Sequence, residues 1–173
     1  MAEFRRVGFA NAQTTKIAEA AGVGHGTFFF HFPTKEHILL ELQQRAQTRM
    51  SDQLRSRRGR PPSVKGFLRR VIDLIIVEEV AVSTELLREL LAVHVRRLLN
   101  VDAIPAPLVD VIAQFFRQAS ERGEVRTDLG PDELAGFFLA ALFGVLLRRA
   151  ESPKARKPDL QRVTDVFVRG IAP

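Results

Sequence analysis

Residues 14–35 constrain the fold of this chain most strongly, because they contain two short helical patterns separated by a glycine. The segment reads TTKIAEAAGVGHGTFFFHFPTK. In the first pattern Ile17 and two alanines share one face at helical spacing, and Thr14 or Thr15 can cap that helix. Gly22 is expected to end it in the left-handed conformation that glycine tolerates. This order predicts a helix-turn-helix, the alternative being a plain helical hairpin whose glycines only make turns.

The second helix of this motif begins among glycines and is rich in aromatic residues. Gly24 and Gly26 carry no bulky side chain, so the backbone there can approach a DNA surface closely. Phe28 and Phe32 are four residues apart and are expected to pack inward together. Four side chains are left to face outward or sideways: His25, Thr27, Phe29 and His31. Pro33 then ends the helix and the next one follows at once, which predicts a module that reads DNA with its second helix.

The charge of the chain is concentrated beside this motif. Residues 1–60 hold 10 lysines and arginines against 5 aspartates and glutamates, whereas residues 61–173 hold 16 against 15. A basic N-terminal third suits attraction to phosphate. The arginines at 55–60 are interpreted as a solvated linker, because Pro61 and Pro62 follow them. We therefore divide the chain into a DNA-binding domain, residues 1–48, and a second domain, residues 49–173.

The second domain is predicted to be helical throughout, which makes the fold all-α. No segment shows the alternation of a strand. The 173 residues, 46% of them hydrophobic, suffice for one small module and one larger helical domain, and with no cysteine the chain forms no disulfide. Residues 152–157 are expected to form an exposed loop. Five helices are predicted after the prolines, over residues 63–81, 83–99, 107–122, 131–150 and 158–171.

Residues 134–147, LAGFFLAALFGVLL, are apolar around the whole circumference of a helix. One side can face its own domain, and a second subunit would cover the other. Such a helix paired with the last one predicts a four-helix dimer interface, the alternative being a helix buried at the centre of a monomer. The predicted interface residues are Phe137, Phe138, Ala141, Leu142, Val145, Val163, Val166 and Phe167.

The strings IAEAAGV and GTFFFHFPTKE resemble the DNA-binding segment of the tetracycline-repressor (TetR) family of bacterial transcription regulators, with the specific match running from residue 8 to about residue 40. The resemblance implies a homodimer that binds a palindromic operator, and a C-terminal domain whose small-molecule ligand alters DNA affinity. Repression released by the ligand is expected, and activation stays open. The contacts implied with double-stranded DNA are Thr14, Thr15, Lys16, Gly24, His25, Gly26, Thr27, Phe29, His31 and Lys35.

Two departures from the family pattern bear on DNA binding. Phe29 stands where the family usually has a tyrosine that bonds to phosphate, and this chain contains no tyrosine. The first helix is also shorter than usual, since only residues 2–7 precede Gly8. Either the chain is trimmed or the module is truly short. A helical interaction protein of the same fold that has lost DNA binding is therefore kept as the alternative function.

The effector cannot be identified from the sequence. A pocket between the helices of residues 63–122 is predicted, although most of its apolar lining is expected to be ordinary core. The candidate pocket residues are Phe67, Ile75, Glu78, Leu91, His94, Phe115 and Phe116.

Other classes of protein lack support in the sequence. No nucleophile elbow, phosphate-binding loop or dinucleotide fingerprint is present, and the four histidines do not have metal-ligand spacing, so neither an enzyme nor a cofactor is expected. The N-terminus lacks the apolar stretch of a signal peptide, and the longest apolar run is shorter than the roughly 20 residues that span a bilayer. A cytoplasmic protein without a membrane partner is the resulting expectation.

Overall fold

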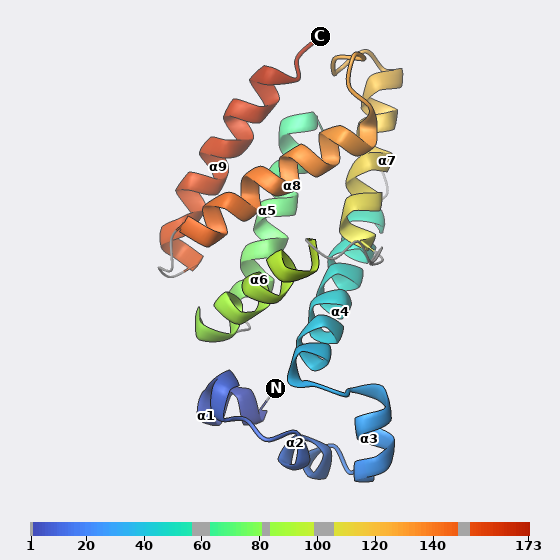
Figure 1. Ribbon diagram of the computed structural model, residues 1–173. Coiled ribbons are helices and arrows are strands. Elements are labelled where there is room, and N and C mark those ends of the chain that lie inside the picture. Colours follow the sequence, from blue (N-terminus) through green and yellow to red (C-terminus); the bar gives the residue numbers. More distant parts are fainter. Residues whose placement is uncertain (1, 57–62, 81–83, 99–105, 149–152) are drawn as a thin grey trace. The chain divides into compact units, whose positions relative to one another are not determined.

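The computed structural model describes residues 2–56, 63–80, 84–98, 106–148 and 153–173 (Figure 1). Within these ranges it contains helices and no strand, which confirms the all-α prediction. The helices are α1 Ala2–Asn11, α2 Thr14–Ala20, α3 His25–His31, α4 Lys35–Arg55, α5 Val64–Val80, α6 Thr84–Leu98, α7 Pro107–Glu121, α8 Pro131–Arg148 and α9 Pro153–Gly170.

The predicted C-terminal helices agree with the structure except at the start of the last one. We expected a loop over residues 152–157, but α9 already begins at Pro153 and continues through Pro158. Arg156 on its second turn is only 1% exposed. The expectation of an exposed loop is therefore wrong from residue 153 onward. Local rules place the start of the helix at Pro158. In the structure the turn before Pro158 is also helical, because tertiary packing overrides the local preference.

Two compact units make up the fold. One consists of residues 1–45 and 81–104, and the other of residues 46–80 and 105–173. The sequence-based division at residue 48 lies close to the first of these boundaries, but it did not expect α6 to belong with the N-terminal helices. Contacts between α1 and α6 bring this about. They join segments far apart in the sequence, which helical periodicity cannot reveal.

The N-terminal unit is held by an apolar cluster that includes Leu86 and Val93 of α6. The other buried members of this cluster are Phe4, Phe9, Ala12, Ala18, Phe28, Ile38 and Leu39. α1 is kinked at Gly8, where φ is 75° and ψ is 169°. A Cβ atom at Gly8 would stand 2.6 Å from Oε1 of Glu85 on α6. Gly8 therefore adopts a backbone conformation that is open almost only to glycine.

We expect Gly8→Ala to lower the free energy of unfolding by about 1 to 3 kcal/mol, because alanine is strained in this region of φ and ψ. Urea denaturation followed by circular dichroism measures the change. Gly26→Ala is the matched control in the same unit. Outside its own stretch of helix, no heavy atom of the described residues lies within 4 Å of its Cβ position, and alanine in a helix should raise stability by up to about 1 kcal/mol. Equal stability of the two variants would contradict the strain at Gly8.

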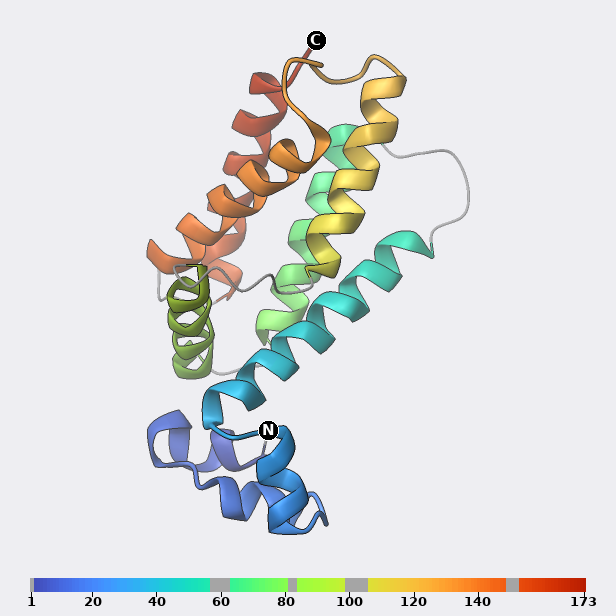
Figure 2. The same ribbon diagram turned by 45° about the vertical axis from the view of Figure 1, so that its right-hand side comes forward.

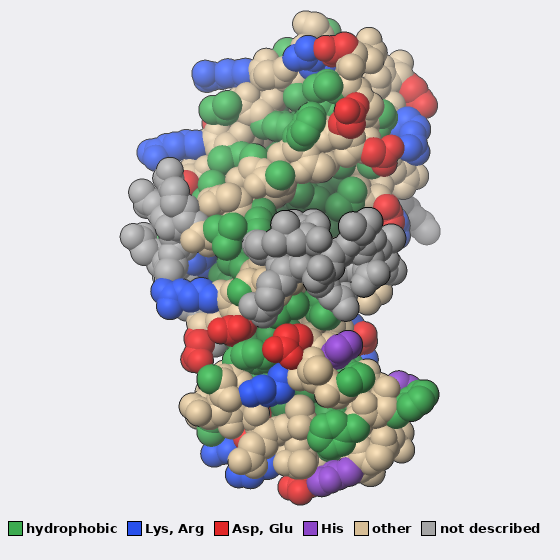
Figure 3. Space-filling model, viewed as in Figure 1, with side chains coloured by type: hydrophobic (Ala, Val, Ile, Leu, Met, Phe, Trp, Pro, Cys, Tyr) green, Lys and Arg blue, Asp and Glu red, His purple; other side chains and the backbone are tan. Residues whose placement is uncertain are grey.

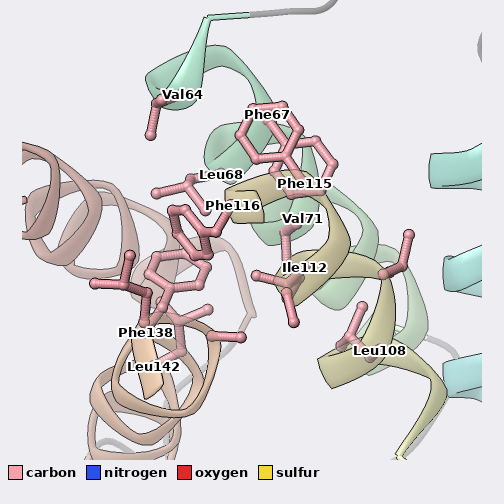
Figure 4. Close-up of a cluster of buried hydrophobic side chains, with 14 of the residues drawn as sticks. Val64, Phe67, Leu68, Val71, Leu108, Ile112, Phe115, Phe116, Phe138 and Leu142 are labelled. Atoms are coloured by element: carbon pink, nitrogen blue, oxygen red, sulfur yellow. The ribbon is translucent and has the colours of Figure 1, made fainter. Parts of the chain in front are cut away.

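The C-terminal unit has its core between α5, α7, α8 and α9, where α8 and α9 lie side by side in both ribbon views (Figure 2). Figure 4 shows side chains from α5, α7 and α8 converging on Phe116, which is fully buried. The rings of Phe67 and Phe115 are stacked, with centroids 3.8 Å apart. α7 buries one continuous apolar face because its hydrophobic residues recur at helical spacing.

The C-terminal end of the chain is tied to the turn between α7 and α8. The backbone N–H of Arg126 donates to the carbonyl of Ile171 at 2.9 Å, and its Nη1 donates to the carbonyl of Gly170 at 3.2 Å. Ile171 is buried in the core. In the same turn, the guanidinium of Arg126 lowers the pKa of Asp128 by hydrogen bonding. These contacts show why the closing segment packs as part of the unit.

Among the described residues, none of the helices combines the length and apolar character needed to cross a membrane.

Candidate nucleic-acid interface

The turn between α2 and α3 has the geometry that the sequence predicted. Gly22 has a φ of 66°, and the N–H of Val23 donates to the carbonyl of Ala18 at 3.1 Å. This left-handed glycine closes α2 and redirects the chain into α3. The expected threonine cap is wrong, since α2 begins at Thr14 and its N-cap is Gln13, which makes no side-chain capping bond.

Phe28 and Phe32 anchor α3 to the unit, as predicted. Phe28 is buried, Phe32 is half-buried, and their ring centroids are 5.2 Å apart. Because the two residues are four apart, they fix which face of the helix points inward. The face opposite them is consequently free for contact with a ligand.

The residues predicted to contact DNA on α3 are exposed. Gly24 is the N-cap residue, and a Cβ placed at Gly24 or Gly26 would have no heavy atom of the described residues within 4 Å outside its own stretch of chain. The exposed residues are Gly24, His25, Gly26, Thr27, Phe29 and His31. On α2, Lys16 is exposed, while Thr14 and Thr15 are half-buried. The structure therefore brings the α3 residues together on one open helix with α2 packed beside it.

His25 has two neighbours on this surface. Its Nε2 lies 3.8 Å from Oε1 of Glu19, and its ring meets that of Phe29 edge to face with centroids 6.4 Å apart. The imidazole remains half exposed, with a side-chain exposure of 52%. It thus keeps a ring nitrogen available for hydrogen bonding to a base edge.

Lys35 has a role in the protein that the sequence did not show. Its Nζ donates to the carbonyls of Phe9 at 3.0 Å and Ala10 at 2.7 Å, and it lies 5.2 Å from the centroid of the Phe9 ring. Two of its three N–H donors thus satisfy carbonyls in the last turn of α1. The predicted phosphate contact of Lys35 can use only the remaining donor, so its main contribution lies in holding α1 against the motif.

Phe30 is a surface residue of α3 to which the sequence analysis gave no role. Its exposed fraction is 82%, the highest of the exposed large hydrophobic residues in the described part of the chain. The helical period already places residue 30 opposite Phe28, so its orientation could have been predicted. Figure 3 shows exposed hydrophobic and histidine side chains near one another on the N-terminal unit.

Comparison with known proteins identifies the motif. The model of the family described as "Bacterial regulatory proteins, tetR family" matches residues 1–42, which contain the whole of α1, α2 and α3. A chain of Thermus thermophilus FadR, a TetR-family transcriptional repressor solved with lauroyl-CoA, superposes with a TM-score of 0.74. It is 26% identical, and the match covers 98% of this chain and 87% of that one.

Residues 1–42 carry the DNA-binding segment of the TetR family of bacterial regulatory proteins.

One curated relative agrees with this assignment, and a further solved structure shares the fold. The HTH-type transcriptional repressor DhaR of Mycobacterium sp. (strain GP1) is 25% identical over 174 residues, covering 95% of this chain and 84% of the relative. The fatty acid degradation regulator FadR of Bacillus halodurans shares the fold, with a TM-score of 0.66 at 19% identity over 98% of this chain and 94% of that one. The matched family and the DhaR relative are transcriptional regulators, and this chain is a regulator of the same kind.

The predicted dimer residues divide into two groups. Phe138 and Leu142 are at most 1% exposed and belong to the core of the C-terminal unit, so their assignment to an interface is corrected. Phe137 and Val166 are 55% and 70% exposed. The remaining predicted residues are exposed Ala141 and half-buried Val145, Val163 and Phe167. Because α8 is apolar all round, its sequence alone could not show which side faces inward.

The predicted pocket residues are divided as well. Phe67, Phe115 and Phe116 pack in the core and Ile75 packs against it, whereas Leu91 lies on α6 of the N-terminal unit. His94 is also on α6, and its side chain lies outside the described residues.

Glu78, the polar pocket candidate, already has a partner. It accepts from Nη2 of Arg49 at 2.7 Å and from Nε at 3.1 Å, and this pair raises the pKa of Arg49. Its carboxylate is thus matched by a cation of the protein. The carboxylate of Glu78 is therefore already paired and is not available to bind a cationic effector.

Proposed function

We propose that this regulator is a homodimer that binds a palindromic operator through α3 and is released from it by a small molecule. The observation that carries the proposal is the division of α3 into two faces. Phe28 anchors the helix in the unit, while His25 and Thr27 are exposed beside the open Cβ position of Gly26. Such a helix can enter the major groove and bring polar side chains to base edges.

The exposed side of α8 supports a dimer. Phe137, Ala141 and Gly144 are exposed and recur at spacings of four and three residues, so they form one stripe. Figure 3 shows hydrophobic side chains on this face of the C-terminal unit. Two copies of α8 would cover each other's stripes, with Val166 of α9 beside them. Two α3 helices about 34 Å apart would then meet successive major grooves on one side of the DNA.

The effector is proposed to be lipophilic. The interior of the C-terminal unit is lined by apolar side chains, and its stacked pair Phe67 and Phe115 would have to separate to admit a ligand. The Thermus thermophilus relative was solved with lauroyl-CoA, so an acyl thioester is the first compound to test. A ligand that stabilises the separated arrangement would change the equilibrium between DNA-binding and released states.

The test is a fluorescence-polarisation titration against a duplex selected from a random DNA library by the full chain, with excess nonspecific competitor. We expect His25→Ala to weaken binding about 5- to 100-fold, since a good side-chain contact to a base edge has that effect. His37→Ala is the control, because His37 is also exposed but lies on α4 and bonds to Thr34. A chain that selects no duplex would favour the alternative of an interaction protein that has lost DNA binding.

The same complex tests the effector. Lauroyl-CoA should release the duplex, whereas coenzyme A without the acyl chain should not. Unchanged polarisation with lauroyl-CoA would contradict an acyl effector without affecting the DNA-binding proposal.

A further inference from the structure

Phe30 has no evident role in holding the fold. Its side chain is 82% exposed, and its ring meets that of His31 edge to face, with centroids 5.4 Å apart. Phe28 and Phe32, its neighbours two positions away on either side, supply the inward packing of α3. A large apolar side chain presented on a functional helix is better explained by something that covers it.

The position of Phe30 on α3 places it toward DNA in the proposed complex. It follows Gly26 by four residues, so both share one face of the helix. α3 has seven residues and is therefore about 10 Å long, less than the roughly 12 Å width of the major groove. When a helix of this length enters the groove, both its first turn and its last turn lie close to the bases.

The chemistry of the ring limits what it can recognise there. A phenyl group neither donates nor accepts conventional hydrogen bonds, so it cannot read the polar edges of guanine, cytosine or adenine. Thymine alone presents an apolar group in the major groove, its 5-methyl. We propose that Phe30 selects thymine in each half-site by packing against this methyl group. The inference rests on the proposed function, since it requires α3 to enter the groove.

The experiment replaces single thymines by uracil in the duplex selected by the full chain, which removes the methyl group and leaves base pairing intact. At one thymine of the half-site, wild-type affinity should fall about fourfold for each methyl lost. Phe30→Ala should bind the thymine duplex about 10- to 100-fold more weakly and should no longer distinguish uracil from thymine at that position.

Two further variants separate recognition from folding. Phe30→Leu keeps an apolar side chain and should retain part of the thymine preference. Val77→Ala also removes an exposed apolar side chain, but from α5 of the C-terminal unit, and should leave both affinity and preference unchanged. Since Phe30 is exposed, the melting temperature of Phe30→Ala should match that of the wild type.

Four results would overturn the inference. Insensitivity of the wild type to uracil at every position would exclude methyl recognition. An equal uracil effect in wild type and Phe30→Ala would assign the methyl contact to another residue, and a loss of affinity in Phe30→Ala without any uracil effect would indicate packing on deoxyribose. A chain that selects no duplex would overturn the proposed function, and the thymine inference with it.

Discussion

Replacing Phe138 by alanine is expected to lower the free energy of unfolding by about 3 to 5 kcal/mol. Phe138 is fully buried in the C-terminal unit, and its ring centroid lies 5.2 Å from that of Phe167 on α9. Truncation removes the apolar burial of the ring and leaves a cavity between the two helices. The loss would be a large part of the roughly 5 to 15 kcal/mol that stabilises a typical domain. Urea denaturation at several protein concentrations measures it.

Two controls make this result specific. Phe138→Leu keeps most of the apolar volume and should cost less than about 1.5 kcal/mol. Val77→Ala removes apolar atoms from an exposed position and should change stability by no more than about 0.5 kcal/mol. A loss below about 1 kcal/mol in Phe138→Ala would argue against a core position and would restore the original assignment of Phe138 to a dimer interface.

The second large effect is expected from charges on the exposed side of the same helix. Phe137→Glu combined with Ala141→Glu should convert the proposed dimer into a folded monomer. Around a twofold axis the two changes bring four carboxylates into one apolar interface, where unpaired charges are strongly unfavourable. Operator affinity should then fall by more than about 100-fold, because each monomer would bind its half-site alone. Analytical ultracentrifugation gives the mass, and the polarisation titration gives the affinity.

The control for this variant is Gln114→Glu, which adds a carboxylate at an exposed position of α7 outside the proposed interface. It should leave mass and affinity unchanged. Circular dichroism should show the same helical content in all variants, because every substituted side chain is exposed. A double variant that keeps the wild-type mass, or a wild type that is already monomeric, would show that this surface is not the interface.

The two predictions depend on neighbouring phenylalanines that the sequence does not distinguish. Phe137 and Phe138 lie in a helix that is apolar on every side, so no amphipathic pattern indicates which of them faces inward. Contacts with Phe167 and the rest of the core decide it. The same limit applies to the pocket residues, where Phe67 and Phe115 could equally have lined a site or packed together.

Local rules were sufficient for the turn and the inward packing of the helix-turn-helix, although not for the cap of α2. The left-handed Gly22 and the inward pair Phe28 and Phe32 follow from spacing and from the freedom of glycine, and the structure confirms them. Local rules also placed α5 to α8 within one or two residues of their observed ends. They were wrong about the start of α9, because burial of Arg156 is a tertiary effect.

The sequence by itself therefore determined the helical fold, the helix-turn-helix and the outward face of α3, since each depends on residues within a few positions of one another. The tertiary structure decided which side of α8 is buried, that α6 belongs with the N-terminal helices, and that Lys35 holds the end of α1. Each of these depends on atoms brought together from distant parts of the chain. The periodicity of a sequence indicates which residues share a face of a helix. Which other helix covers that face is decided only by tertiary packing.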